Sequence, residues 1–220
     1  MEMERKLLTQ TKDNKEIARR RPPRFDLIAG NVSLDFVNTL DDRHIKPKEL
    51  IETYADLARF GEDTGLLEPS QVDRLYERSY ADPERAKQAL LWGRELREAI
   101  HDVFWAIMNK RAVPPLALAR LNSYVQAAAG HLRLVAAKKG FEWSFDDLLD
   151  FESVLWPIAR SAADLLASDQ LAYVRACSSK ACEWFFLDTS KNHHRRWCDM
   201  TRCGNRAKVQ RFYARQKKGR

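Results

Sequence analysis

Residues 177–203 read CSSKACEWFFLDTSKNHHRRWCDMTRC and contain all four cysteines of the 220-residue chain. The cysteines form two Cys-x4-Cys pairs, Cys177/Cys182 and Cys198/Cys203, with fifteen residues between the pairs. Two short loops that each offer two thiolates can close a tetrahedron around one metal ion without a large core, and this spacing lies within the range of structural zinc sites. The pattern therefore predicts one structural Zn²⁺ site with four cysteine ligands.

Three alternatives remain open for these cysteines. They could be buried free thiols, although unligated core cysteines would not be expected to cluster as matched pairs. They could form two disulfides, but the N-terminal residues MEMERKLLTQ contain no apolar run typical of a secretory signal, which favours the reducing cytoplasm. His193 or His194 could also replace one thiolate.

The residues around the cysteines resemble a known family, the CGNR zinc finger. The resemblance rests on the metal spacing together with four segments: residues 186–192 (FLDTSKN), residues 196–198 (RWC), Met200 and residues 203–208 (CGNRAK). It covers about fifty residues. It implies a treble-clef-like arrangement, in which a knuckle, two short strands and a helix share one zinc ion.

A second resemblance lies near the N-terminus. Gly30-Asn31 and residues 34–39 (LDFVNT) are similar to the opening of the ABATE domain, which usually precedes that finger. Together the two resemblances imply a bacterial protein of the stress-induced transcription regulator type.

Charge divides the chain into three parts. Residues 171–220 carry 13 Lys/Arg and 3 Asp/Glu, a balance of +10, and residues 1–24 carry 8 against 4, or +4. The remaining 17 basic and 24 acidic residues give residues 25–170 a balance of −7. Basic ends indicate an anionic partner, with nucleic acid first and a membrane surface second. We expect no membrane-spanning segment, because no apolar run approaches the roughly twenty residues that a span requires.

These observations predict three regions. Residues 1–24 form a mobile basic arm, residues 25–168 a helical ABATE-like domain, and residues 171–220 the zinc finger. Because zinc ligation and folding of small metal domains are coupled, we expect chelation to unfold the finger and to leave the helical domain intact.

Hydrophobic periodicity predicts a mainly α fold with a small β-hairpin. A short strand is expected at Phe25–Ile28, and a hairpin at residues 131–145 around the turn Lys138-Lys139-Gly140. Helices are expected after Ser33 through Leu40, from Pro47 to Gly61, from Pro69 through Tyr76, from Pro83 to about Lys110, from Leu116 to Ala129, and from about Asp147 to Ser168 with a kink at Pro157. In the finger we expect strands at residues 173–175 and 184–187 and a helix from near Gly204.

The helix after Cys203 carries a basic stripe. At one hundred degrees per residue, one face gathers Lys208, Arg211, Arg215 and Lys218. Additional positive charge comes from Arg195, Arg196, Arg202 and Arg206. A basic helix fixed by a metal knuckle suits the major groove or the phosphate backbone of DNA, and Arg211 and Arg215 are candidates to contact guanine.

Other finger residues are assigned structural roles. We expect Asn205 to shape and cap the helix start, and Phe185, Phe186 and Trp197 to form the small core. Binding to RNA or the ribosome, or a protein-interaction adaptor with a purely structural finger, are the alternatives to DNA binding.

A polar helix face lies near the start of the acidic middle of the chain. Asp35, Asn38 and Thr39 share this face, and Arg97 could pair with Asp35. The four residues are a candidate pocket for a small-molecule effector, whereas the simpler interpretation is that they brace neighbouring backbone, which we favour.

An enzymatic function is not expected. Four cysteine ligands leave no open position for a metal-bound water, and the sequence has no Gly-rich phosphate loop or nucleophile elbow. His44, His101 and His131 are isolated in the sequence, and we expect each to be packed or exposed instead of catalytic. The operator, the effector, the oligomeric state and the sign of regulation are not specified by these patterns.

Overall fold

The computed structural model describes residues 25–146, 150–179 and 182–218. The basic arm predicted at residues 1–24 lies outside the described residues. The structure is mainly helical, as the sequence predicts, and its described part contains three two-stranded sheets. None of the described helices is both long and apolar enough to cross a membrane.

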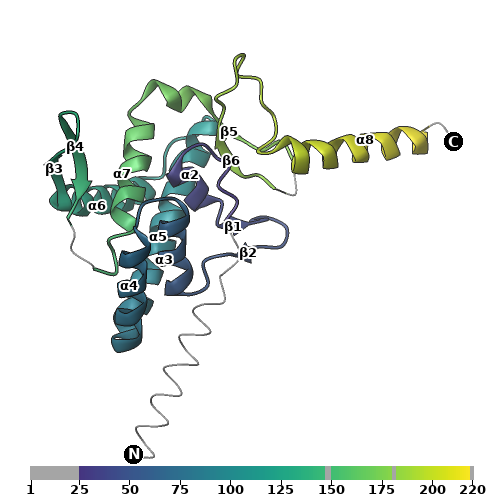
Figure 1. The fold of residues 1–220 in the computed structure, drawn as a ribbon. Coiled ribbons are helices and arrows are strands. Elements are labelled where there is room, and N and C mark those ends of the chain that lie inside the picture. Colours follow the sequence, from purple (N-terminus) through teal and green to yellow (C-terminus); the bar gives the residue numbers. More distant parts are fainter. Residues whose placement is uncertain (1–24, 147–149, 180–181, 219–220) are drawn as a thin grey trace, which may run out of the picture.

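The helical body is organised around α5, which spans Pro83–Met108 (Figure 1). Its buried face includes Leu96, Ile100 and Phe104, and the helix contacts α2, α3, α4, α6 and α7. The surrounding helices are α2 (Val32–Val37), α3 (Tyr54–Asp63), α4 (Pro69–Ala81), α6 (Pro115–His131) and α7 (Leu155–Leu166). The predicted long core helix is therefore confirmed.

Two helices begin at residues other than those predicted. The side chain of Asn31, not that of Ser33, caps α2 by accepting a hydrogen bond from the backbone N–H of Ser33 at 2.9 Å. Helix α3 begins at Tyr54, because Thr53 and Asp56 form a reciprocal capping box there. The prediction of a helix from Pro47 is wrong, since β2 (Lys48–Glu49) pairs with β1 (Leu40–Asp41).

The N-terminal and α7 predictions also need correction. Residues 25–28 form no strand. Helix α7 begins at Leu155, so Pro157 lies in its first turn, where its missing N–H removes no helical hydrogen bond and no kink is needed. The predicted helix start at residues 147–149 lies outside the described residues.

The remaining strands match their predictions. β3 (Leu132–Ala136) and β4 (Phe141–Phe145) form the expected antiparallel hairpin. In the finger, a 3₁₀ turn (Asp169–Tyr173) leads into β5 (Val174–Ala176), which pairs with β6 (Phe185–Leu187). A π-helical turn (Met200–Gly204) then leads into α8 (Asn205–Lys218), which projects away from the body (Figure 1).

The finger and the helical body share one hydrophobic core. Phe185, Phe186 and Leu187 of β6 are buried in the same cluster as Leu34 and Phe36 of α2. In addition, the backbone N–H of Leu187 donates a 2.7 Å hydrogen bond to the carbonyl of Ala29. The zinc-finger strands are therefore part of the body's packing.

Candidate metal centre and nucleic-acid interface

The four cysteine sulfurs lie close enough to hold one metal ion. All four Sγ atoms lie within 4.8 Å of one another. The Sγ of Cys198 lies 3.5 Å from that of Cys182 and 3.6 Å from that of Cys203. Zn–S bonds of about 2.3 Å place tetrahedral sulfurs about 3.8 Å apart. The cluster therefore fits a four-cysteine zinc site, and this fit confirms the predicted cofactor.

The four thiols of the cluster influence one another's pKa values. Hydrogen bonding from Cys182 lowers the pKa of Cys177, whereas interaction with Cys177 raises the pKa of both Cys182 and Cys198. Burial raises the pKa of Cys203, and the nearby Cys177 adds to that effect. The protein alone therefore favours a single thiolate, because further thiolates repel it. A divalent cation compensates this repulsion and lets all four thiols ionise.

Two alternatives to zinc ligation by four cysteines, a pair of disulfides and a histidine ligand, do not match the structure. No disulfide joins any of the four cysteines. The ring of His193 stacks on Tyr173 at 3.9 Å, and its Nδ1 lies 2.8 Å from the carbonyl oxygen of Asp188, away from the cluster. His194 is exposed.

The first cysteine pair is positioned by backbone hydrogen bonds at the end of the β5–β6 sheet. The N–H of Cys177 donates to the carbonyl of Trp184 at 2.8 Å, and the N–H of Cys182 donates to Ser179 at 2.9 Å. Ser178 donates to the carbonyl of Arg196 at 2.8 Å, which ties this loop to the segment that carries the second pair.

Asp199 orders the second cysteine pair. Its side chain accepts from the N–H of Arg202 at 2.7 Å, and its carbonyl accepts from Cys203 and Gly204 at 3.1 Å. A Cβ on residue 204 would overlap the Met200 sulfur, so the Met200 side chain would have to move to admit any larger residue there. Asn205 is exposed and lies in ordinary helical conformation, so the expected capping role belongs to Asp199.

Asp188 organises the loop between the two cysteine pairs, a role that the sequence analysis did not assign to it. Its buried carboxylate accepts from the N–H and hydroxyl of Ser190 at 3.0 and 2.6 Å and from the N–H of Arg195 at 2.8 Å. Burial alone would raise the pKa of Asp188, but these hydrogen bonds and the nearby His193 hold that pKa below its usual range. The Asp-x-Ser spacing is the only sequence signal for this turn.

The side chain of Asn38 joins the body to the finger. Its Nδ2 donates to the carbonyl of Phe185 and its Oδ1 accepts from the N–H of Phe185, both at 2.9 Å. Trp184 adds a 2.8 Å hydrogen bond from its indole N–H to Asp41, and Arg202 pairs with Asp26. The two regions are thus joined by directional bonds as well as by apolar packing.

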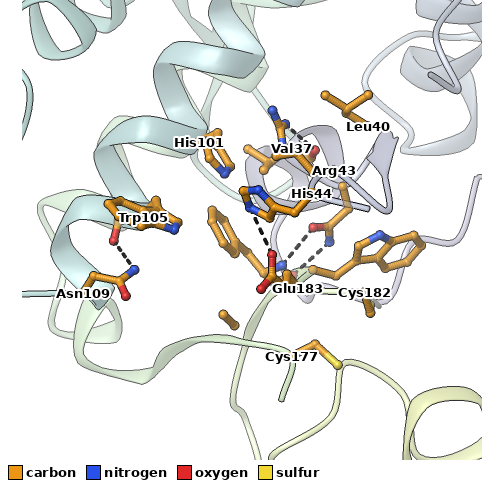
Figure 2. A pocket seen from close by; sticks show the side chains of 14 residues that line it. Val37, Leu40, Arg43, His44, His101, Trp105, Asn109, Cys177, Cys182 and Glu183 are labelled. Carbon is orange, nitrogen blue, oxygen red and sulfur yellow. Dashed lines mark hydrogen bonds and ion pairs between the residues drawn. The ribbon is translucent and has the colours of Figure 1, made fainter. Parts of the chain in front are cut away.

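A cavity of about 150 Å³ lies at this junction (Figure 2). His44 Nε2 and Glu183 Oε2 lie 3.0 Å apart beside it and link the body to the finger. The ring of His101 stacks on Phe185 at 5.3 Å, and burial, helped by the charge of Arg43, lowers the pKa of His101. His101 is therefore a neutral packing residue at neutral pH.

The other residues of the candidate effector pocket make internal contacts. Asp35 accepts from the N–H of Ala29 at 2.9 Å, and it does not pair with Arg97. Arg97 instead binds both carboxylate oxygens of Glu49 at 2.6 Å and contacts the Thr39 hydroxyl at 3.2 Å. The suggested pair of Asp35 with Arg97 was wrong, because Glu49 of β2 satisfies the guanidinium.

Burial raises the pKa of Asp35 to about 6. The hydrogen bonds from the Ala29 and Ile28 backbone act in the opposite direction and limit this rise. Of the four residues, only Asn38 lines the junction cavity. Such contacts are expected of residues that stabilise the neighbouring backbone. Effector binding at this polar face stays a prediction.

The predicted basic residues fall into two groups. Arg195 is half-buried; its guanidinium donates to the carbonyls of Trp197 and Cys198 and lies over the Phe186 ring. Arg202 lies over the ring of Trp184 and pairs with Asp26. These two side chains are engaged within the molecule, which favours structural roles for them.

The second group is exposed. It comprises Arg196, Arg206, Lys208 and Arg211. The side chains of Arg215 and Lys218 lie outside the described residues, although α8 includes both positions. Val209, Phe212 and Tyr213 are also exposed, so the outer part of α8 does not pack on the zinc core.

Comparison with protein families matches both regions of the chain. Residues 30–169 match the ABATE family model, described as "Putative stress-induced transcription regulator". Residues 173–216 match the CGNR zinc finger model. Comparison with curated proteins finds no match to the chain.

Proposed function

Since the chain belongs to the ABATE family of transcription regulators and carries a CGNR zinc finger, we propose that it regulates transcription by binding DNA through α8. Zinc would act structurally here, by cross-linking the two cysteine loops and fixing the start of the helix. Cys177, Cys182, Cys198 and Cys203 would hold it.

The charge and position of α8 carry this proposal. Residues 205–218 contain six Lys/Arg and no Asp/Glu, and the helix projects from an acidic body (Figure 1). Fourteen residues extend about 21 Å, and the major groove, about 12 Å wide, admits an α-helix. Charges of one sign repel one another along such a helix, and a polyanion relieves that repulsion.

We assign the contacts with DNA to residues of the exposed group. Lys208 and Arg211 lie three positions apart on one face, which Arg215 and Lys218 continue by helical spacing. Arg206 and Arg196 would approach the phosphates from beside this stripe. We assign no DNA contact to Arg195 or Arg202, because their guanidinium groups already make contacts within the molecule.

Salt-dependent binding tests the proposal. If Lys208 contacts a phosphate, Lys208→Gln should weaken binding to all duplexes alike and reduce the slope of log affinity against log salt by about one. Arg211→Gln should cost about 1–3 kcal/mol on the preferred site if Arg211 contacts guanine. Fluorescence anisotropy of labelled duplexes measures both quantities.

A matched control distinguishes the helix from general charge effects. Lys87 is an exposed lysine on α5, and Lys87→Gln removes the same charge from the body. The control should bind DNA as the unmodified protein does, and every variant should retain one zinc per chain. Equal effects of Lys87→Gln and Lys208→Gln would contradict the proposed surface.

Competition separates the alternatives. Displacement of bound duplex DNA by structured RNA at lower concentration than by unlabelled DNA would favour an RNA-binding role. Absence of binding to either nucleic acid at physiological salt would favour the adaptor role. Effector sensing by the helical body is the second half of the proposal, and it requires a ligand site in that body.

A further inference from the structure

The helical body contains a pocket far from the residues proposed to contact DNA. It has a volume of about 460 Å³ and lies between α5, α6 and the start of α7. Ligand pockets for small molecules typically occupy about 300–1,000 Å³. The lining residues are Trp92, Glu95, Ser123, Tyr124, Ala127, His131, Asp150, Glu152, Leu155 and Trp156.

Three carboxylates give the lining of this pocket a negative charge. Glu95, Asp150 and Glu152 line it, and among its lining residues there is no Lys or Arg. One oxygen of Glu152, Oε2, is buried and has no hydrogen-bond partner among the described residues. A buried carboxylate oxygen without a partner is costly, and a bound cation would stabilise it.

Two arginines at the rim neutralise the carboxylates only in part. Arg85 lies 3.3 Å from Asp150 and 3.5 Å from Glu152, and its side chain is 52% exposed. Arg120 lies 3.1 Å from Glu95, whose other oxygen accepts from the Tyr124 hydroxyl at 3.3 Å. Burial, with the neighbouring Asp150 adding to it, raises the pKa of Glu152, as expected where negative charge is undercompensated.

Aromatic rings supply the second half of the site. Trp92, Tyr124 and Trp156 line the pocket, and the ring of His131 stacks on Trp156 at 3.6 Å. In the described part of the chain, no Arg lies over the ring of Trp92, Tyr124 or Trp156. The electron-rich faces of aromatic rings attract cations, and tryptophan does so most strongly.

We propose that this pocket binds a small organic cation, such as a quaternary or protonated amine with an apolar substituent. Its charged group would lie beside Glu152 and Asp150, and its apolar part against Trp92, Tyr124 and Leu155. A neutral ligand could donate a hydrogen bond to the Glu152 oxygen but would leave the negative charge of the three carboxylates uncompensated, and an anion would be repelled by them. This inference concerns ligand binding by the helical body and does not depend on DNA binding by α8.

Benzyltrimethylammonium is a suitable probe, with benzyl alcohol and benzylsulfonate as its neutral and anionic counterparts. Titration of the full chain with zinc, followed by the indole N–H signals in two-dimensional NMR, reports on all six tryptophans. We expect the cation to shift the signals of Trp92 and Trp156 and to leave that of Trp197 unchanged. Benzyl alcohol should bind at least about tenfold more weakly, and benzylsulfonate should not bind.

Two substitutions are expected to change the affinity for the cation in opposite directions. Glu152→Gln keeps the shape of the side chain and should weaken binding of the cation about fivefold or more. Arg85→Gln removes the competing cation at the rim and should tighten binding severalfold. Glu142→Gln, on the exposed hairpin strand β4, is the control and should bind as the unmodified chain does.

The proposal is overturned if benzyl alcohol binds as tightly as the cation, or if no probe shifts Trp92 or Trp156 at millimolar concentration. It is also overturned if Glu152→Gln, folded as judged by its NMR spectrum, binds the cation with unchanged affinity. Because Arg85 is half-exposed, Arg85→Gln provides a folded variant even if Glu152→Gln is destabilised.

Discussion

The two ends of the zinc finger meet very different surroundings. At β6, Phe185, Phe186 and Leu187 are at most 7% exposed, and hydrogen bonds join this strand to Asn38 and Ala29, which flank α2. At α8, Val209 and Phe212 are more than half exposed, and the helix projects from the body. The difference indicates a finger whose first half stabilises the protein and whose second half is free to contact a partner.

Removal of zinc should have the largest effect, and it tests whether the first half is truly part of the body. Apparent zinc-binding free energies of finger peptides are about 10–16 kcal/mol. Because β6 shares a core with α2, we now expect Cys198→Ser or chelation to lower the unfolding temperature of the helical body as well as that of the finger. Calorimetry with and without chelator measures this. An unchanged transition of the helices would restore the picture of two independent domains.

Loss of the Asn38 side chain should have the next largest effect. Asn38→Ala leaves the buried N–H and carbonyl of Phe185 without partners, which should cost roughly 2–4 kcal/mol. Urea unfolding measures the change, and Asn122→Ala, at an exposed position of α6, is the matched control. Similar stabilities of the two variants would mean that the junction contributes little.

Gly204→Ala tests the connection between the two halves. The added methyl group would meet the Met200 side chain, and overpacking of this kind costs about 1–3 kcal/mol. Because a methionine side chain can adjust, we expect the lower part of that range, seen as faster zinc release to a competing chelator. Met200→Ala in the same chain should restore the slower release. Failure of this rescue would argue against the steric explanation.

Polar substitution on α8 should have the smallest effect on stability. Phe212 is 58% exposed, so Phe212→Gln should change the free energy of unfolding by less than about 0.5 kcal/mol. Urea unfolding is again the measurement. A loss of 2 kcal/mol or more would show that α8 packs on another surface in solution, and the contrast between the two halves would then fail.

Patterns within a short stretch of sequence predicted those elements whose structure is determined by residues close together in the chain. Apolar spacing located α5, alternation located the β3–β4 hairpin, and paired spacing located the metal ligands. Periodicity also identified the polar face that carries Asn38. It could not identify the partner, because Phe185 lies 147 residues away and offers its backbone, which has no sequence signature.

Charged partners were equally hard to predict. The sequence suggested a pair of Asp35 with Arg97, yet a two-residue strand brings Glu49 to Arg97 instead. Strands this short carry no detectable alternation. From the sequence, Arg195 likewise adds to the positive charge available to DNA. The folded loop shows that its guanidinium donates to backbone carbonyls instead.

The hydrogen bonds between Asn38 and Phe185 also affect how the protein is made. At about 5–20 residues per second, the ribosome needs roughly 7–30 s to add the 147 residues between them. During that time α2 exists without the strand that covers it, and its apolar residues face water or a chaperone. Completion of the N-terminal region must then wait for the last part of the chain, which also carries the four cysteines.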